Sequence, residues 1–348
     1  MHYNKKKYIF LLLVLGLLFA LSGCSSKDPV KYSNTGFAMG TTISEVIYGD
    51  DEKSLEENGQ AIMNLLGDLE RGQISWRLHS SEIYRMNHSD DSVEVSHDVY
   101  EWIKESLAIC EDTDGALNPG IGVLAHLWDI GGDHARVPSK AEIKEAKNQI
   151  DAKAINIEET DKVSIDPDKV QVDLGAVGKG AAADAVMRYL KSAENISGAL
   201  ISVGGSLCVY GEKPDQSSWT VGIQDPRAED GVMLGKVEVS GGTFVSTSGD
   251  YEKYIEQDGK RYHHILDSKT GYPSESGLIS VTIVCESGID SDALSTACFV
   301  LGMEKSLPIL EKYDAEAVFV DEEHGVCKTD GVKFTLDNTK DYKMKEIK

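Results

Sequence analysis

Glycines and a lysine are concentrated in residues 170–184, which read Val-Gln-Val-Asp-Leu-Gly-Ala-Val-Gly-Lys-Gly-Ala-Ala-Ala-Asp. This pattern is typical of a strand, a tight glycine loop and a helix over about 180–190. Backbone N–H groups and the positive end of a helix dipole converge at such a loop, which suits phosphate oxygens. It is not a Walker A loop, because Gly175 and Gly178 are too close together and glycine follows Lys179 where Ser or Thr would bind magnesium. From the spacing alone, phosphate binding and a purely structural turn are about equally supported.

A second group of chemically active side chains lies in two stretches, 244–251 and 263–273, on either side of a predicted hairpin. Hydroxyl residues fill the first stretch, and His263, His264 and Asp267 lie in the second. Near neutral pH, His264 can act as an acid, a base or a hydrogen-bond donor to phosphate. Structural alternatives exist for its neighbours, since Asp267 can cap a Thr-Gly turn and His263 can simply face solvent.

A carboxylate and a hydroxyl, those of Asp292 and Thr296, are spaced to share one face of a predicted helix. Such hard oxygen ligands suit Mg²⁺ or Ca²⁺ and not zinc. The structural alternative is an ordinary helix start, with Asp292 as the cap and Thr296 packed inward. Taken alone, this segment favours that alternative.

The elements that must position these residues alternate without a regular β-α-β rhythm, which indicates the α+β class. Ser96 is expected to cap a helix that Gly115 stops. Further predicted helices cover 55–69, 140–149 and 291–301. Strands are predicted over 199–203, 207–210, 219–223, 234–239 and 278–284, with a hairpin over 251–263 that turns at Asp258-Gly259.

The first 23 residues are expected to be a lipoprotein signal peptide. Three lysines precede an apolar run from Tyr8 to Leu21, which is too short to span a membrane comfortably. The run ends in Leu-Ser-Gly-Cys, so cleavage would leave Cys24 as the lipid-bearing residue; the alternative is an ordinary secretory signal. Residues 24–35 are then a tether, 36–336 one large domain, and 337–348 a charged tail too polar to pack. The expected location is the extracytoplasmic face of the cell membrane.

Composition limits the partners. The chain of 348 residues has 35 Lys and Arg against 58 Asp and Glu, a formal charge of −23. A dedicated nucleic-acid binder needs clustered cations, so no nucleic-acid partner is expected. The five cysteines after Cys24 are widely spaced in mostly apolar surroundings, which indicates buried thiols. A single disulfide is the alternative interpretation.

Seven short blocks in order give the sequence a specific resemblance to the ApbE family, the FAD:protein FMN transferases, over roughly residues 35–336. A lipobox, which family members often carry, precedes them. The blocks are Phe37-Ala-Met-Gly-Thr-Thr42, Gly115-Ala-Leu-Asn-Pro119, Val172–Asp184, Ser202-Val-Gly-Gly205, Thr247-Ser-Gly-Asp-Tyr251, His264–Gly271 and Asp292-Ala-Leu-Ser-Thr296.

The resemblance implies a single α+β domain with a mostly antiparallel sheet and flanking helices. It also implies magnesium-dependent transfer of FMN from FAD to a Thr or Ser hydroxyl of an exported electron-transfer protein, with release of AMP. His264 matches the residue that assists phosphoryl transfer. FAD contacts carry over to Met39, Trp76, Ala116, Leu117, Asn118, Asp173, Lys179 and Leu266.

For the metal, the resemblance implies the carbonyl of Ala176 and the side chains of Asp292 and Thr296. Ser295 stands where many members have Asp, which predicts a weaker or water-mediated ligand. Ser268 replaces a usual proline and is expected to loosen its turn. Two alternatives to the transferase are an FAD pyrophosphatase giving FMN and AMP, and a flavin-binding lipoprotein without catalysis.

Overall fold

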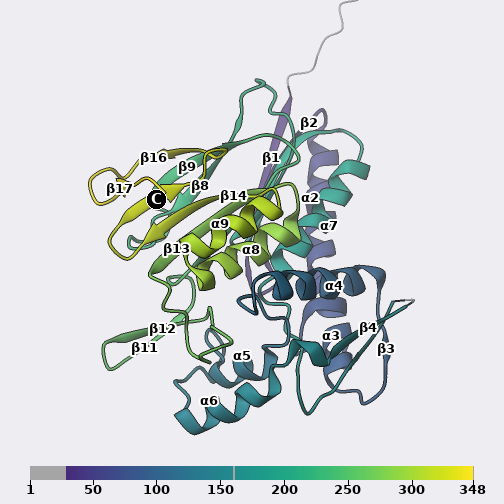
Figure 1. Ribbon diagram of the computed structural model, residues 1–348. Coiled ribbons are helices and arrows are strands. Elements are labelled where there is room, and N and C mark those ends of the chain that lie inside the picture. The colour runs from purple at the N-terminus through teal and green to yellow at the C-terminus, as the bar shows by residue number, and fades with distance from the viewer. Residues whose placement is uncertain (1–28, 160, 348) are drawn as a thin grey trace, which may run out of the picture.

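A nine-stranded sheet forms the centre of the protein in the computed structural model, which describes residues 29–159 and 161–347 (Figure 1). All neighbouring strands are antiparallel except the last pair, β15 and β17. In spatial order the strands are β1 (Val30–Ala38), β2 (Thr41–Gly49), β6 (Ile196–Val203), β7 (Ser206–Gly211), β10 (Phe244–Gly249), β13 (Leu278–Cys285), β14 (Glu316–Asp321), β15 (Gly325–Lys328) and β17 (Lys343–Met344).

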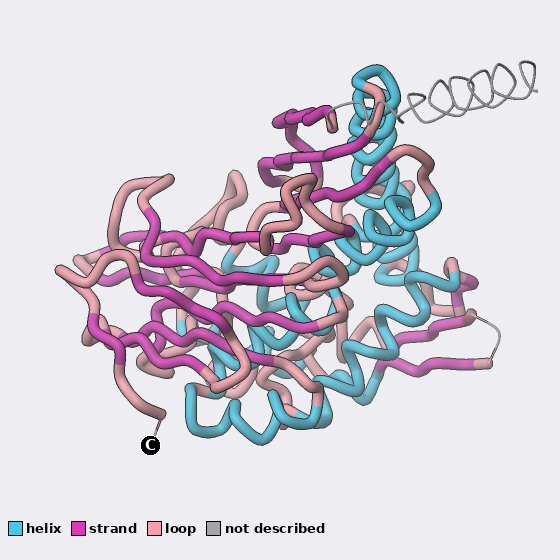
Figure 2. The backbone as a smooth tube through the Cα atoms, turned by 90° about the horizontal axis from the view of Figure 1, so that it is seen from above, coloured by secondary structure: helices cyan, strands magenta, loops and turns pink. Residues whose placement is uncertain are grey.

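Helices cover one face of this sheet and a smaller sheet covers part of the other (Figures 1 and 2). The small sheet packs β8 (Trp219–Gln224), β9 (Met233–Val239) and β16 (Lys333–Leu336) against the main one through a second hydrophobic core. The covering helices are α2 (Glu52–Leu69), α7 (Gly178–Ser192), α8 (Gly288–Leu301), α9 (Met303–Lys312) and, outside α8, α4 (His97–Asp112). The prediction of a single α+β domain with a mostly antiparallel sheet is confirmed.

Shorter elements surround the lower end of the main sheet in Figure 1. A π-helical turn (Glu70–Ile74) continues α2, and the hairpin of β11 (Tyr254–Gln257) and β12 (Lys260–His263) pairs with no other strand of the described chain. The remaining elements are α3 (Glu82–Asn87), α5 (Gly122–Trp128), α6 (Lys140–Ala146) and the small sheet of β3 (Val93–Glu94), β4 (Ile155–Glu158) and β5 (Lys162–Ile165).

Local signals account for several element boundaries. Ser96 caps α4 by accepting from the backbone N–H of Val99, as predicted, and Gly115 with φ 79° donates its N–H back to Cys110. The predicted helix over 140–149 forms as α6 followed by one 3₁₀ turn. The Asp258-Gly259 turn is also confirmed, because both residues have the positive φ of a tight two-residue hairpin.

Several boundaries differ from the prediction, and three of the differences matter for the fold. Residues 30–35 are not a tether but belong to β1, where Tyr32 packs inward and Lys31 and Ser33 face solvent. The helix predicted to begin at Ser291 begins at Gly288, because Ser287 caps it by accepting from Asp290.

The C-terminal residues 337–347 are also not a loose tail. The Tyr342 side chain is 1% exposed, and its hydroxyl donates to Asp225 at 2.7 Å. Residues Lys343–Met344 then add a parallel strand to β15. The prediction of a loose tail rested on the many charged residues of this segment, but the buried Tyr342 among them holds the segment against the protein.

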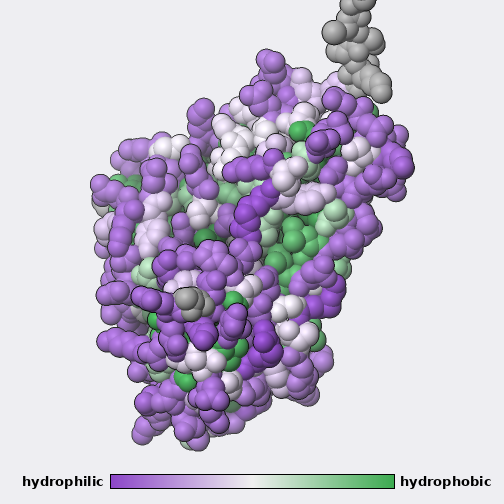
Figure 3. Space-filling view, turned by 90° about the vertical axis from the view of Figure 1, so that its right-hand side faces the viewer, coloured by the Kyte–Doolittle hydropathy of each residue, from purple (hydrophilic) through white to green (hydrophobic). Residues whose placement is uncertain are grey.

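The surface is mostly hydrophilic, in keeping with the acidic composition; the side of α4 and β3–β5 shows hydrophobic groups mainly in one hollow (Figure 3). Five cysteines of the described chain are free, four of them buried, which confirms the prediction of buried thiols. Within residues 29–159 and 161–347, no helix is both long and apolar enough to span a membrane. The predicted signal peptide and Cys24 lie outside the described residues.

Candidate active site

A cavity of about 400 Å³ opens at the end of the main sheet where the β1–β2 turn, the start of α7 and the β11–β12 hairpin meet. All the site residues predicted from the sequence line it except Asp292 and Ser295, which are buried, and Cys24, which lies outside the described residues. The lining residues among them are Met39, Trp76, Ala116, Leu117, Asn118, Asp173, Ala176, Lys179, His264, Leu266 and Thr296. The fold therefore brings together residues that are up to 257 positions apart in the chain.

The glycine loop packs α7 directly on α8. A Cβ on Gly180 would lie 2.1 Å from the carbonyl oxygen of Gly288, and one on Gly288 would lie 2.5 Å from that of Gly180. The Asp184 carboxylate completes the contact by accepting the N–H groups of Gly288 and Ile289 at the start of α8, at 2.9 and 2.8 Å. The loop thus fixes both helix starts, so its structural role is confirmed whatever it binds.

The Asp292 carboxylate lies where the two helices meet and is 1% exposed. It accepts the Gly180 N–H at 2.9 Å and the Ser206 hydroxyl at 3.0 Å, and the Lys179 ammonium lies 3.4 Å from it. Asp292 is therefore not the helix cap of the structural alternative, since Ser287 fills that position. The carboxylate thus has a fixed position between two hydrogen-bond donors and a lysine.

Hydroxyl groups continue from Asp292 toward the cavity. Ser248 on β10 is 2.7 Å from the Ser295 hydroxyl and 3.2 Å from that of Thr296, and Ser295 also donates to the Asp292 carbonyl. Thr296 and Ala176 reach the cavity wall, while Ser295 lies behind it. Residues 29–159 and 161–347 hold no cluster of three or more His, Cys, Asp or Glu side chains suited to a metal.

The donor chemistry nevertheless fits a hard cation. One carboxylate, a carbonyl and hydroxyls are oxygen ligands of the kind that Mg²⁺ takes together with water and substrate phosphates. These residues fit Mg²⁺ better than a soft metal, because no thiolate or imidazole belongs to the set.

Two charged residues that the sequence reading did not assign, Glu252 and Lys253, also line the cavity. Burial opposes the charge on Lys179, but the Asp292 and Glu252 carboxylates outweigh it and raise the pKa of Lys179. For Lys253, burial and then the neighbouring Lys179 lower the pKa. Burial, with the Asp292 charge, raises the pKa of Glu252. The sequence does place Glu252 and Lys253 directly after the Thr-Ser-Gly-Asp-Tyr block, and this position could have marked them as site residues.

His264 lines the same cavity at the base of the β11–β12 hairpin. The carbonyl of Lys253 accepts its backbone N–H at 3.0 Å and lies 3.3 Å from Nδ1. A carbonyl only accepts, so Nδ1 carries the proton and Nε2 is the free basic nitrogen. Burial, then the charges of Lys179 and Lys253, lower the pKa of His264 to about 3. The imidazole is therefore neutral at physiological pH, with its Nε2 unprotonated.

Aromatic and apolar groups form the opposite part of the cavity. The Trp76 ring stacks on His126 with centroids 3.4 Å apart, and the Arg77 guanidinium lies 4.0 Å over the same ring. Arg77 is held by Asp129 at 2.9 Å, and His126 lies 3.5 Å from the Asp173 carboxylate. Sequence reasoning found Trp76 and Asp173 but not the residues that position them.

The β1–β2 turn closes this side of the cavity. Met39 and Gly40 both have positive φ, 54° and 66°, and the Met39 N–H donates to the Glu70 carboxylate at 2.8 Å. Glu70 lies at the start of the π-helical turn and was not predicted as a site residue. It fixes the position of Met39 at the cavity wall.

The turn that follows His264 resolves the alternatives for its neighbours. Asp267 does cap it, accepting the Lys269 N–H at 2.8 Å, whereas His263 is buried and does not face solvent. The expectation that Ser268 loosens this turn is wrong, because its hydroxyl donates to the Gly115 carbonyl at 2.7 Å. Asn118 lines the cavity while its amide bridges Ile150 and Gly120.

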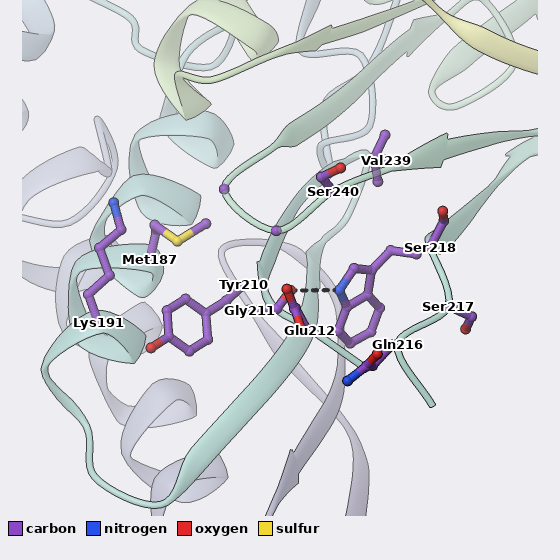
Figure 4. Close-up of a pocket in the computed structure, with 13 residues that line it drawn as sticks. Met187, Lys191, Tyr210, Gly211, Glu212, Gln216, Ser217, Ser218, Val239 and Ser240 are labelled. Carbon is purple, nitrogen blue, oxygen red and sulfur yellow. Dashed lines mark hydrogen bonds between the residues drawn. The ribbon is translucent and has the colours of Figure 1, made fainter. Parts of the chain in front are cut away.

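A larger and more open cavity of about 680 Å³ lies at the other end of α7 (Figure 4). Lys191, Tyr210 and Ser240 are among its lining residues, and Trp219 donates its indole N–H to the Gly211 carbonyl there. It contains none of the site residues predicted from the sequence. The chemistry-bearing residues therefore belong to the smaller cavity.

The smaller cavity combines an aromatic wall, which suits a ring compound, with lysines and buried oxygen ligands, which suit a phosphate ester and a cation. A neutral histidine lies beside them, as in enzymes that act on phosphate esters. Comparison with known proteins identifies the family. The chain belongs to the ApbE family, whose model matches residues 39–319.

Similar proteins agree with this assignment. A protein of Klebsiella pneumoniae named FAD:protein FMN transferase is 34% identical over 84% of this chain and 90% of its own length. One of the same name from Treponema pallidum is 31% identical over 87% and 88%. The crystal structure of the Thermotoga maritima ApbE protein matches with a TM-score of 0.79 at 32% identity, covering 86% of this chain and 97% of that one.

The apo flavinyl transferase ApbE of Pseudomonas stutzeri matches with a TM-score of 0.71 at 30% identity, covering 88% and 95%. The expectation that the chain is a transferase of this family is thus confirmed.

Proposed function

We propose that this protein transfers the FMN portion of FAD to the hydroxyl of a Thr or Ser in a target protein and releases AMP. One observation carries the proposal: His264, Lys179 and Thr296 line a single cavity, and the Asp292 carboxylate is buried directly behind Lys179. A base for the hydroxyl and positive charge for a pyrophosphate are the two requirements of this phosphoryl transfer. The names of the relatives, FAD:protein FMN transferase, support FAD as the donor of the FMN group and a protein as its acceptor.

In the proposed step, the acceptor oxygen attacks the phosphorus on the FMN side of the pyrophosphate. A new P–O bond forms as the bridging P–O bond breaks, and AMP leaves with that electron pair. The hydroxyl proton passes to Nε2 of His264, whose Nδ1 the Lys253 carbonyl holds. Lys179 and Lys253, which both line the cavity, neutralise charge on the phosphates. The wall formed by Trp76 and Met39 receives the flavin ring.

We further propose that the transfer depends on Mg²⁺, held by the Ala176 carbonyl, Asp292, Thr296 and, through water, Ser295. A bound divalent cation would stabilise negative charge on the pyrophosphate oxygens. Ca²⁺ is the alternative occupant of the resting site, because the same oxygen ligands suit it.

The proposed setting is the extracytoplasmic face of the cell membrane, with a lipid on Cys24 as the anchor. The motivation is the apolar run and lipobox-like Leu-Ser-Gly-Cys of the sequence. One acyl chain binds membranes weakly, so at least two would be needed on Cys24. The proposed acceptors are exported electron-transfer flavoproteins. Mass spectrometry of Cys24 in the membrane fraction tests the anchor, and an unmodified Cys24 would refute it.

The test of the activity uses residues 25–348 with FAD, Mg²⁺ and an acceptor domain of an exported electron-transfer protein. The intact mass of the acceptor and the release of AMP are measured together. A gain of one FMN with equal AMP, absent in Asp292→Ala, is the expected result. Free FMN with AMP at saturating acceptor would indicate an FAD pyrophosphatase instead. FAD that binds but stays intact would indicate a non-catalytic flavin-binding protein.

A further inference from the structure

β1 is one of the two edge strands of the nine-stranded sheet, and β17 is the other (Figure 1). It pairs with β2 along all nine residues from Val30 to Ala38 without a register shift. Long, regular edge strands are a liability, which proteins usually reduce with charges, prolines or bulges. Within Val30–Ala38 there is one charged residue, Lys31, and neither a proline nor a bulge.

The turn shows which backbone groups the edge presents. Met39 and Gly40 form a two-residue turn, so Ala38 and Thr41 are the hydrogen-bonded pair next to it. Hydrogen-bonded positions alternate along the strand, and the N–H and C=O groups of Phe37, Thr35 and Ser33 therefore point away from β2. These three residues offer a row of donors and acceptors to an added strand.

The same residues also face solvent with their side chains. Phe37 is 73% exposed, the highest value among the large hydrophobic residues of the described chain. Its cross-strand partner Thr42 and the nearby Thr35 and Ser44 are exposed as well, because the small sheet of β8, β9 and β16 packs elsewhere. An aromatic ring on a flat hydroxyl-rich surface is typical of a protein-binding anchor.

This edge leads directly to the candidate active site. Phe37 precedes Met39, a residue of the cavity wall, by two positions, or about 7 Å of strand. The Met39 N–H is fixed by Glu70, so the end of the edge has a set position relative to the cavity. A chain bound along β1 would thus deliver a residue to the cavity mouth in a defined register.

We propose that β1 is the docking edge for the acceptor protein, which adds an extended segment to the strand with Phe37 as its apolar anchor. This inference rests on the proposed function, since a protein hydroxyl must reach the cavity for transfer. Addition of a strand gives affinity through backbone hydrogen bonds while its side chains give specificity. The register between Phe37 and Met39 then selects which hydroxyl residue of the acceptor is modified.

Four variants test the edge against the acceptor domain that the wild-type protein labels. Thr35→Pro removes an outward N–H without breaking a bond to β2, and Thr35→Ala is its matched control, which keeps that N–H. Phe37→Ala removes the anchor. Met233→Ala, at a 46% exposed residue at the start of β9, is the control for loss of a surface hydrophobic group.

We expect Thr35→Pro and Phe37→Ala each to raise the KM for the acceptor about tenfold, while FAD binding and the thermal unfolding midpoint stay near wild type. Thr35→Ala and Met233→Ala should leave all three values unchanged. Unchanged acceptor KM in both test variants would overturn the docking edge while leaving the transferase standing. Failure of the wild-type protein to label any acceptor would overturn both. A β1-mediated dimer of this protein that Thr35→Pro dissociates, seen by sedimentation, would assign the edge to a second copy and also overturn the proposal.

Discussion

The substitution Gly180→Ala tests whether the glycine loop is a packing device for the site. The new methyl group would lie 2.1 Å from the Gly288 carbonyl oxygen and 2.6 Å from the Asp292 Cβ, so α7 and α8 must separate by about 1 Å. Overpacking of this kind costs about 1–3 kcal/mol. Loss of the buried bond from the Gly180 N–H to Asp292 adds about 1–3 kcal/mol, and better helix propensity returns about 1 kcal/mol. The expected loss is about 1–5 kcal/mol of the free energy of unfolding.

Urea unfolding at pH 7 measures this loss, with Gly178→Ala as the matched control at the start of the same helix. The methyl group on residue 178 would meet only the Ile74 side chain, at 3.0 Å, which can move aside. We expect that control to lie within about 1 kcal/mol of wild type. Equal stability of the two variants would refute the reasoning, because it would show that α7 and α8 tolerate a methyl group between their backbones. Since the shift displaces Asp292, FAD cleavage should also fall in Gly180→Ala.

Three further predictions concern single side chains. His264→Asn should reduce transfer about 10²–10⁴-fold with little change in FAD binding, measured by acceptor mass and flavin fluorescence; a normal rate would exclude His264 as the base. Burial raises the pKa of Asp290, and the smaller, opposite effect of its hydrogen bond with Ser287 does not cancel this rise. Ionisation of Asp290 therefore lowers the free energy of unfolding as the pH rises above the ordinary carboxyl pKa of about 4. Asp290→Asn should therefore stabilise the protein by about 1 kcal/mol at pH 7 and by less at pH 4 in thermal unfolding, and a destabilisation at pH 7 would contradict this. Tyr342→Phe removes the hydroxyl bond to Asp225 and should cost about 1–2 kcal/mol in urea unfolding, whereas no loss would show that this bond does not stabilise the C-terminal segment.

Local sequence signals predicted the elements whose ends depend on neighbours in the chain. Ser96 caps α4 and Asp258-Gly259 forms the turn because both effects act within three residues. The strand at 30–38 was missed although its inward and outward positions alternate, since the inward set includes Asn34 and glycine and looks polar. The buried Tyr342 was not predictable locally, because its partner Asp225 lies 117 residues away.

The same distinction applies to the site. Blocks with a family resemblance pointed to His264, Lys179 and Asp292, and the fold does bring these together. Glu70 and Arg77 were missed because each acts on another residue, Met39 and Trp76 respectively, through a contact that only the fold creates. Residues that position a reactive group carry no chemical signature of their own in a sequence.

The charge distribution reconciles an acidic protein with an anionic substrate. The formal charge of −23 is spread over a surface where salt screens interactions beyond about 8 Å. Lys179 and Lys253 line the cavity, where a pyrophosphate would contact them directly and salt would screen their charges less. Because Asp292 already balances Lys179 and Glu252 lies near Lys253, the cavity would gain a net attraction for phosphate mainly from a bound cation. Binding of FAD should therefore depend on the divalent cation far more than on the ionic strength.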